Sequence, residues 1–267
     1  MKIAVSGKGG VGKTFIAGTL ASIGASRGRR VIAIDADSSP NLALTLGLTP
    51  EESDAIQPIA ENRDVISLKT GTAYPGVYSL SFTVDDVIND HALATPAGVH
   101  LLVMGTVFSM GSGCTCQANA LVRALLRHLV VKQDDDVILD LEAGVEHLGR
   151  GTADHVDILL VVSDANMKSL RTAKKIHDLA AGAGPKEVFL VGNQIQGEEQ
   201  KERVAQFAQE NGITLIGMVP FDETIRAAGM RGEVIPPDAE ERAIVSLRGL
   251  YEKMIENQQA TRRGDAT

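Results

Sequence analysis

Short apolar runs alternate with helical patterns along most of this chain. The apolar runs predict seven strands, at residues 2–6, 30–35, 100–105, 136–141, 157–163, 187–193 and 214–219. Segments with helical periodicity lie between them and include 13–26, 117–131 and 167–181. The strands are almost wholly apolar, which is typical of strands that are buried on both faces of a parallel sheet. The pattern therefore predicts an α/β fold with a doubly wound, mostly parallel sheet flanked by helices.

Length and composition favour a single domain. A chain of 267 residues allows one large domain or two small ones, and its 44% of hydrophobic residues is ample for a large core. No internal repeat or low-complexity linker divides the sequence. We therefore interpret residues 1–255 as one domain and residues 256–267 as a polar, frayed tail. Thr49, with Glu52 three residues later, predicts a capping box at the start of a helix.

The charge balance and the two ends of the chain argue against two classes of partner. The net charge is -8, aromatic residues make up 3% and tryptophan is absent, whereas nucleic-acid surfaces need basic patches and stacking platforms. Met1 leads straight into an apolar strand without the features of a signal peptide, so we expect a cytoplasmic protein. Residues 251–267 are too polar for an amphipathic membrane anchor. We expect neither nucleic acid nor membrane as a partner.

The first predicted strand ends in GKGGVGKT, residues 7–14, which fits the phosphate-loop pattern between a strand and a helix. Its glycines let backbone N–H groups turn toward phosphate oxygens, and the start of the next helix adds its positive end. The expected ligands are ATP and ADP with Mg²⁺. We expect Lys13 to reach the β- and γ-phosphates of ATP and the Thr14 hydroxyl to bind Mg²⁺. The alternative is a glycine-rich turn without a ligand. The residues expected around the phosphates are Gly7, Lys8, Gly9, Gly10, Val11, Gly12, Lys13, Thr14 and Phe15.

Two aspartates after later strands complete this candidate site. Asp140 ends the strand 136–141, where a carboxylate is suited to hold Mg²⁺ directly or through water. Asp35 and Asp37 follow the second strand, and we interpret Asp35 as structural. For Asp37 a turn or helix cap is the alternative to a catalytic role, because aspartate favours both.

The only two cysteines, Cys114 and Cys116, lie in GSGCTC within a stretch, 92–122, that has no charged residue. A disulfide across one residue would be strained, and two thiolates are half of a closed metal site. Two chains related by a two-fold axis would pool four thiolates. The alternative for the two cysteines is that they are buried and inert. For the uncharged stretch, one interpretation is a surface that a partner covers, and the alternative is a core strand with a tight loop.

The second lysine of the loop, Lys8, makes KGGVGKT resemble the MinD/nitrogenase-iron-protein class of ATPases with their deviant Walker A motif. The resemblance implies that Lys8 reaches across a dimer to the nucleotide of the other subunit. A cation there would stabilise the charge that develops on the γ-phosphate. The sequence departs from the class at Phe15, because a second hydroxyl residue usually follows Thr14. That departure concerns one side-chain contact to the α-phosphate and not the site itself.

The same resemblance implies roles for residues on other strands. Asp37, in switch I with Asn41, would orient or deprotonate the attacking water, so that the catalytic residues are Lys8, Lys13 and Asp37. LEAG, residues 141–144, corresponds to switch II with Glu142, Ala143 and Gly144. The adenine contacts implied by the resemblance are Asn193, Pro220 and Asp222; without it they are ordinary turns after strands.

GSGCTC and DLEAGVEHLGRGTA, residues 140–153, narrow the resemblance to the CooC family of nickel-insertion ATPases that mature carbon monoxide dehydrogenase. It implies an ATP- and metal-promoted homodimer in which Cys114 and Cys116 share Ni or Zn between two subunits. A nickel enzyme of the carbon monoxide dehydrogenase type is the implied client. His147 is interpreted as a packed switch residue rather than a ligand. The alternatives are a nucleotide-switched MinD-like scaffold and an iron–sulfur carrier ATPase.

Overall fold

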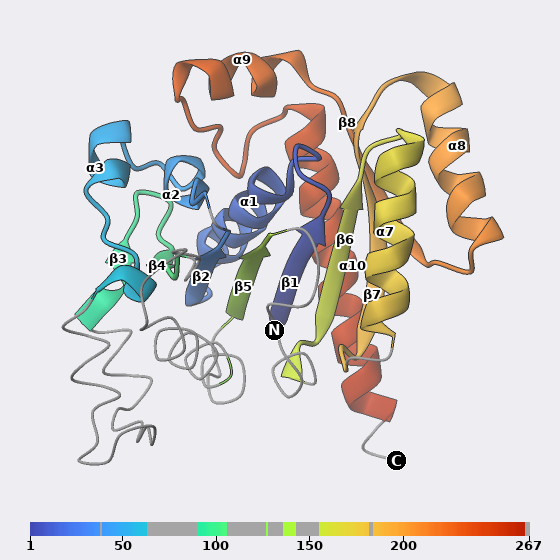
Figure 1. Cartoon of the computed structure of the whole chain (residues 1–267), viewed down its shortest axis with the longest axis horizontal. Helices are drawn as coiled ribbons and strands as arrows, with labels where there is room; N and C mark the ends of the chain where they lie inside the picture. The colour runs from blue at the N-terminus through green and yellow to red at the C-terminus, as the bar shows by residue number, and fades with distance from the viewer. Residues whose placement is uncertain are drawn as a thin grey trace, which may run out of the picture.

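The computed structural model describes residues 1–37, 39–62, 90–105, 127, 136–142, 155–181 and 184–264 of the chain. The described residues form one mixed sheet with helices on both faces (Figure 1). The strands are β1 (Lys2–Gly7), β2 (Val31–Ala36), β3 (Leu93–Ala94), β4 (His100–Val103), β5 (Asp136–Leu141), β6 (Ile158–Ser163), β7 (Glu187–Ile195) and β8 (Leu215–Pro220). The helices are α1 (Lys13–Ser26), α2 (Leu42–Thr45), α3 (Pro50–Asp54), the 3₁₀ turn η1 (Ile59–Glu61), α7 (Met167–Ala180), α8 (Gly197–Glu210), α9 (Glu223–Arg231) and α10 (Arg242–Gly264).

The sheet has the order β3-β4-β2-β5-β1-β6-β7-β8, and every pair except β3–β4 is parallel. The predicted doubly wound α/β fold is therefore confirmed, and all seven predicted strands are present with ends displaced by at most two residues. Strand β3 was not predicted, because two exposed residues are too few to leave an apolar run. The helix predicted at 117–131 falls outside the described residues, apart from residue 127.

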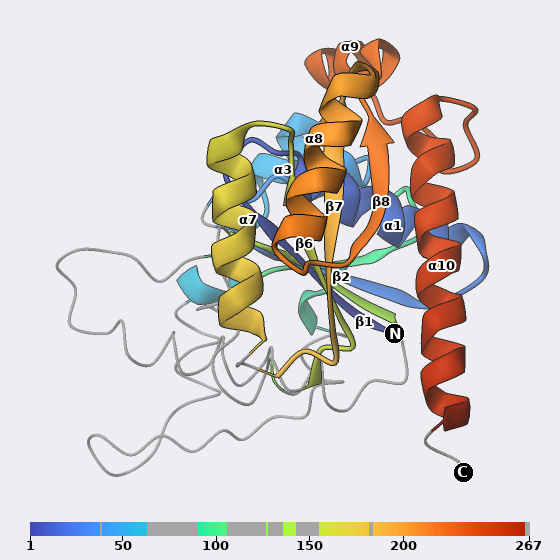
Figure 2. The ribbon, with the colours of Figure 1, turned by 90° about the vertical axis from the view of Figure 1, so that its right-hand side faces the viewer.

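Successive strand residues enter two separate hydrophobic cores. Ala4 packs with the core under α7 and α8, whereas Ile3 and Val5 pack with the core under α1 and α10. Figure 2 shows α7 and α10 on opposite sides of the sheet. Burial of both faces explains why the strands are apolar at nearly every position and do not alternate. No helix in the described part of the chain combines the length and the apolar character that a membrane span requires.

The capping box predicted before α3 is confirmed. The Thr49 hydroxyl accepts a hydrogen bond from the backbone N–H of Glu52, and the Glu52 carboxylate accepts one from the backbone N–H of Thr49. The prediction of a frayed tail from residue 256 is corrected, because α10 continues as a helix to Gly264. The Gln258 amide donates to Asp157 at 2.8 Å, so this part of α10 is attached to the sheet.

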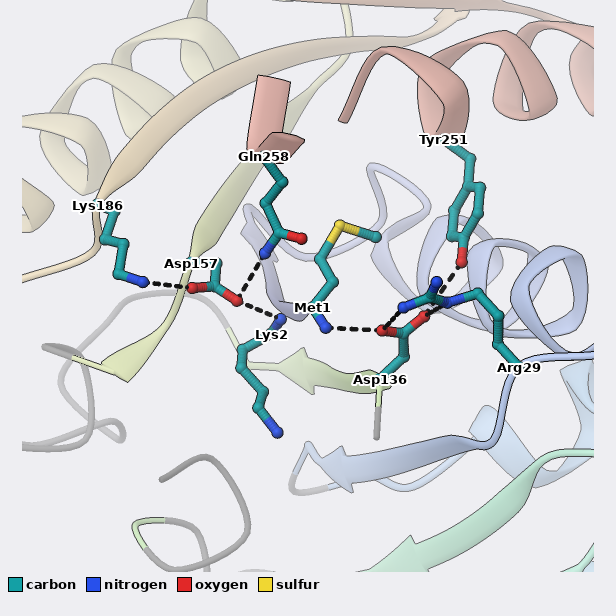
Figure 3. A network of polar contacts seen from close by, with 8 residues as sticks. All are labelled: Met1, Lys2, Arg29, Asp136, Asp157, Lys186, Tyr251 and Gln258. Carbon is teal, nitrogen blue, oxygen red and sulfur yellow. Dashed lines mark hydrogen bonds and ion pairs between the residues drawn. The ribbon is translucent and has the colours of Figure 1, made fainter. Parts of the chain in front are cut away.

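A polar clasp fixes α10 at the amino-terminal edge of the sheet (Figure 3). Asp136, at the start of β5, is paired with the Met1 ammonium at 2.6 Å and with the Arg29 guanidinium, and it accepts a hydrogen bond from the Tyr251 hydroxyl at 3.2 Å. Burial alone would raise the pKa of Asp136, but hydrogen bonds and charge from Arg29 and the ammonium group hold it below its usual value. The ionised carboxylate therefore contributes to the stability of the fold.

We predict that Asp136→Asn lowers the free energy of unfolding by about 3 kcal/mol at neutral pH, because it leaves a buried ammonium and Arg29 without their counter-charge. The folded pKa is depressed, so the contribution is present above the unfolded pKa and is lost as the pH falls through the folded pKa. The difference from wild type should shrink below about pH 4. Urea unfolding from pH 3 to 8 measures it, with Asp178→Asn as a control at an exposed ion pair that should change little. An equal loss of unfolding free energy at every pH would contradict the interpretation that the ionised Asp136 carboxylate stabilises the fold.

Candidate nucleotide-binding site

Most of the described candidate residues lie at or just beyond the carboxyl ends of the parallel strands. The loop 7–12 follows β1 and leads into α1, and the loop 37–41 follows β2 (Figure 1). Asp140 lies near the end of β5, Asn193 near the end of β7 and Pro220 at the end of β8. Because parallel strands end at the same edge of a sheet, these segments meet there, which is where open α/β sheets bind ligands. The clasp around Asp136 is at the opposite edge.

The loop after β1 has the backbone of a phosphate-binding loop. Gly12 adopts φ 89° and ψ 30°, a left-handed conformation that favours glycine, and it precedes the first residue of α1. A Cβ atom on Gly7 would lie 2.3 Å from the carbonyl oxygen of Val162 in the neighbouring strand β6. No side chain among the described residues caps α1, so its first N–H groups remain available to an anion. Lys13 is buried in the first turn, and Thr14 is half-buried beside it.

A cavity of about 500 Å³ joins this loop to the ends of β7 and β8. The residues predicted to bind nucleotide that line it are Gly12, Thr14, Phe15, Asn193, Pro220 and Asp222, and the predicted switch residue Asn41 lines it as well. Asp222 is the N-cap of α9, because its Oδ1 accepts the backbone N–H groups of Thr224 and Ile225. A larger groove of about 800 Å³ lies between α8 and α10, but it contains no residue of the phosphate loop. The phosphate loop and the predicted base contacts therefore share one cavity.

Sequence reasoning missed part of the wall of this cavity. Residues 232–235, in the connection between α9 and α10, line it together with Phe221, Ile225 and Gln194. The connection has no motif, and only the packing of α10 brings it back over the strand ends. Gln194 has φ 57°, and it is the one non-glycine residue with a positive φ in the described part of the chain. No pattern in the sequence signals that conformation.

Asp140 is a buried carboxylate without a full set of partners. No described residue completes a hydrogen bond to either of its oxygens, although the Thr14 hydroxyl lies close enough to lower its pKa. Burial outweighs that effect and raises the pKa of Asp140 to about 7. The charges of Asp35 and Asp37 raise it further, and the charge of Lys13 lowers it. A cation bound here would satisfy the carboxylate, and Thr14 and Asp140 provide the hard oxygen ligands that Mg²⁺ prefers beside phosphates.

Asp35 organises the loop that follows β2. Its Oδ1 accepts the backbone N–H of Asp37 at 3.2 Å, and its Oδ2 accepts those of Asn41 at 3.0 Å and Leu42 at 2.9 Å. Burial raises the pKa of Asp35, whereas these three hydrogen bonds lower it. The interpretation of Asp35 as structural is confirmed by these bonds, which close the loop around a single carboxylate.

Asp37 occupies a turn within that loop. Its Oδ1 accepts the backbone N–H of Ser39 at 3.0 Å, and the Asn41 amide donates to the Ser39 carbonyl at 2.7 Å. The turn that was the alternative for Asp37 is thus present. The charge of Asp37 is nevertheless near enough to raise the pKa of Asp140. A structural and a catalytic role are compatible at this position.

The remaining candidate residues are only partly described. Lys8 is half-buried, and its carbonyl accepts the backbone N–H of Val11 at 3.4 Å. The Glu142 carbonyl accepts the Ser6 hydroxyl at 3.4 Å, which ties the start of the predicted switch II to β1. Ala143, Gly144, Cys114, Cys116 and His147 lie outside the described residues. Within the described ranges no group of three or more His, Cys, Asp or Glu side chains is arranged to hold a metal ion.

Comparisons with known proteins agree with this geometry. The family model for the CobQ/CobB/MinD/ParA nucleotide binding domain matches residues 2–235. The carbon monoxide dehydrogenase accessory protein CooC of Rhodospirillum rubrum is 39% identical over 95% of this chain and 97% of its own length. An uncharacterized ATP-binding protein of Methanocaldococcus jannaschii is 39% identical over 98% of this chain and all of its own length. The septum site-determining protein MinD of Pyrococcus horikoshii, solved with Mg-ADP, has a TM-score of 0.67 at 20% identity, with 94% of both chains covered. At that identity the last match shows the fold alone.

We predict that Asp140→Asn stabilises the ligand-free protein at pH 8 while it removes the response to Mg·ATP. The folded pKa is raised, so the ionised carboxylate costs stability as the pH rises from about 4 to about 7, on the order of 2–4 kcal/mol at pH 8. Asparagine at position 140 has no charge and removes this cost. The stability of the variant relative to wild type should therefore fall toward zero as the pH approaches 4. Thermal unfolding with and without Mg·ATP measures both effects.

Asp35→Asn is the matched control for that experiment. Asp35 is equally buried, but an amide there would direct an N–H group at a backbone donor, so the variant should be less stable than wild type. If Asp140→Asn also lowered the stability of the ligand-free protein at pH 8, the description of Asp140 as an unsatisfied carboxylate would be wrong.

Proposed function

We propose that this chain, which belongs to the CobQ/CobB/MinD/ParA nucleotide-binding family and is a CooC-type member of it, couples ATP hydrolysis to the delivery of a metal ion. The protein is a MinD-like P-loop ATPase. Its role in the maturation of carbon monoxide dehydrogenase follows from its similarity to CooC over nearly the whole of both chains. The observation that carries the catalytic part is the unsatisfied Asp140 carboxylate beside Lys13 and Thr14. Of these three residues, Thr14 lines the cavity.

The phosphate end of the site binds the reacting group. The Lys13 ammonium neutralises the β- and γ-phosphates, and the N–H groups at the start of α1 donate to phosphate oxygens. Thr14 and Asp140 would hold Mg²⁺, which supplies positive charge to the phosphoryl oxygens. Asp37 accepts a hydrogen bond from the attacking water or takes its proton, and the Asp35-organised loop positions it. Asn193, Pro220 and Asp222 hold the adenine at the other end of the cavity.

The ATP-bound state is a homodimer in this proposal. Lys8 extends to the nucleotide of the partner subunit, where its charge stabilises the transition state as an arginine finger does. Residues 141–144 and the loop 37–41 change with the γ-phosphate and transmit hydrolysis to the dimer interface. The similarity of the phosphate loop to the deviant Walker A motif is the support for this arrangement.

The metal site is formed by Cys114 and Cys116 of both subunits. Four thiolates around a two-fold axis bind one Ni or Zn ion, and hydrolysis alters their geometry so that the metal passes to a client enzyme of the carbon monoxide dehydrogenase type. The C-x-C motif and the similarity to CooC support this assignment. A nucleotide-switched scaffold and an iron–sulfur carrier are the other candidates, and metal content discriminates all three.

We predict that the two lysines of the phosphate loop separate binding from turnover. Lys13→Ala should abolish ATP binding, because the β- and γ-phosphates lose their cation. Lys8→Ala should retain most of the affinity and lower turnover by roughly a hundredfold or more, by analogy with loss of an arginine finger. Calorimetric titration with ATP and a phosphate-release assay measure the two quantities. Lys175→Ala, an exposed lysine on α7, should match wild type in both assays. A Lys8→Ala protein that hydrolyses ATP at the wild-type rate would rule out the cross-subunit role.

We predict that metal binding and dimerisation are linked through the cysteines. Wild type should bind one Ni²⁺ or Zn²⁺ per two chains, and the metal should promote dimers without nucleotide, because a ligand that binds only the dimer shifts the equilibrium toward it. Affinity should fall as the pH drops below the thiol pKa values, since thiolates must lose protons to bind. Equilibrium sedimentation with metal counting tests this prediction.

The cysteine double variant is the control for the metal site. Cys114→Ser with Cys116→Ser should lose metal-driven dimerisation and keep ATP binding. One metal per monomer, or a double variant that still dimerises with metal, contradicts the shared site and favours the scaffold. A visible absorption band from the purified protein would instead identify an iron–sulfur carrier.

A further inference from the structure

The end of strand β7 has an irregular backbone next to the phosphate loop. Its pairing with β8 shifts register between Gly192 and Ile195, and Gln194 within that bulge adopts φ 57°. A left-handed conformation costs a residue other than glycine roughly 1 kcal/mol or more, so it persists where the surroundings impose it. Within the bulge the Asn193 side chain is 3% exposed, whereas the Gln194 side chain is exposed. The strain therefore accompanies an inward-facing amide.

The Asn193 amide is bonded to the phosphate loop itself. Its Nδ2 donates to the carbonyl oxygen of Val11 at 2.7 Å in a buried hydrogen bond between residues 182 positions apart. The same nitrogen would lie 2.4 Å from a Cβ atom on Gly12. Val11 and Gly12 directly precede Lys13, so this contact fixes the backbone where the loop enters α1. A glycine at position 12 thus provides both the left-handed turn and the space for the amide.

The rest of the loop has little to hold it in shape. Gly9 and Gly10 are exposed, Gly10 has φ 83°, and a Cβ atom on either would contact nothing within 4 Å. Glycine-rich backbone loses more conformational entropy on ordering than any other, so ordering such a loop on binding lowers affinity. A hydrogen bond already present in the ligand-free protein reduces that cost. Loss of the Asn193 donor would also leave the Val11 carbonyl buried and unpaired.

We propose that Asn193 is a positioning residue of the phosphate loop, whose amide holds residues 11–13 in the phosphate-binding conformation before nucleotide arrives. This role rests on the proposed ATPase function and adds to the base contact at the same residue. An amide has a second N–H and a carbonyl oxygen, so the bond to Val11 leaves groups for a base. One side chain then links the base end of the cavity to its phosphate end.

A ligand without a base separates this role from base recognition. Mg·tripolyphosphate occupies the phosphate loop and cannot contact a base site. Asn193→Ala should weaken binding of Mg·tripolyphosphate by roughly five- to tenfold, which corresponds to loss of one buried hydrogen bond. It should weaken binding of Mg·ATP by at least that factor, because ATP also loses the proposed base contact. Asp222→Asn is the control at the base end, because asparagine also caps a helix well and should preserve α9. It should leave tripolyphosphate binding unchanged. Calorimetric titration measures the affinity of each variant, and of wild type, for Mg·ATP and for Mg·tripolyphosphate.

Hydrogen exchange tests, in the absence of any ligand, whether the hydrogen bond from Asn193 to Val11 holds the loop. In the nucleotide-free protein, the amides of residues 8–14 should exchange faster in Asn193→Ala than in wild type, and those of Asp222→Asn should exchange at the wild-type rate. Asn193→Leu, which keeps the branched shape without a polar atom, should behave as Asn193→Ala does, and it is the substitute where the alanine variant does not fold.

Three outcomes are distinguishable. If wild-type protein fails to bind Mg·ATP, the proposed function fails, and the hydrogen-exchange comparison still decides the role of Asn193. If Asn193→Ala loses affinity for ATP alone and its loop amides exchange at the wild-type rate, Asn193 is a base contact only and the positioning role is wrong. If Asn193→Ala loses affinity for both ligands and its loop amides exchange faster than in wild type, the positioning role is supported.

Discussion

A buried negative charge at the end of a central strand is the constraint on which the candidate site depends. Asp140 lies in β5 between β1 and β2, and no described residue satisfies its oxygens. A carboxylate in that position is stable in its charged form only with a cation beside it. Lys13 supplies part of that charge, and the Thr14 hydroxyl supplies a dipole. In the proposed function, Mg²⁺ bound with a nucleoside triphosphate would supply the remaining positive charge.

The two carboxylates of β5 illustrate how one strand supports stability and function. Asp136, at its start, has its charge matched by an ammonium and a guanidinium, and its pKa is lowered. Asp140, near its end, is left unmatched, and its pKa is raised to about 7. Both side chains are buried, so the difference comes from their partners and not from exposure. The clasp that attaches α10 stabilises the edge of the sheet away from the candidate site. Gln194, which is the one non-glycine residue with a positive φ in the described ranges, lies at the edge with the candidate site.

The sequence predicted the elements whose signal is local. Strands buried on both faces appear as apolar runs, and a glycine-rich loop between a strand and a helix indicates phosphate binding, so the central sheet and the loop at 7–14 could be identified. The length of α10 could not be predicted, because its distal residues are polar. One of them, Gln258, donates a hydrogen bond to the carboxylate of Asp157, which directly precedes β6. The bond from Asn193 to Val11 was equally inaccessible, since no pattern relates residues so distant in the chain. Asn193 lies in the part of β7 where the pairing with β8 shifts register.

In the proposed nucleotide complex, Phe15 would leave phosphate recognition to the backbone more than to side-chain hydroxyls. A hydroxyl at that position would offer one hydrogen bond to an α-phosphate, whereas the uncapped N–H groups at the start of α1 offer several. The phenylalanine ring instead packs against the core under α1 and α10 and also lines the nucleotide cavity. Phe15 thus lacks the hydrogen bond that a hydroxyl could make to an α-phosphate, but it makes apolar contact with the core that positions α1. Because α1 is held by that core, by Gly12 and by Asn193, its N-terminus presents fixed donors without the missing hydroxyl.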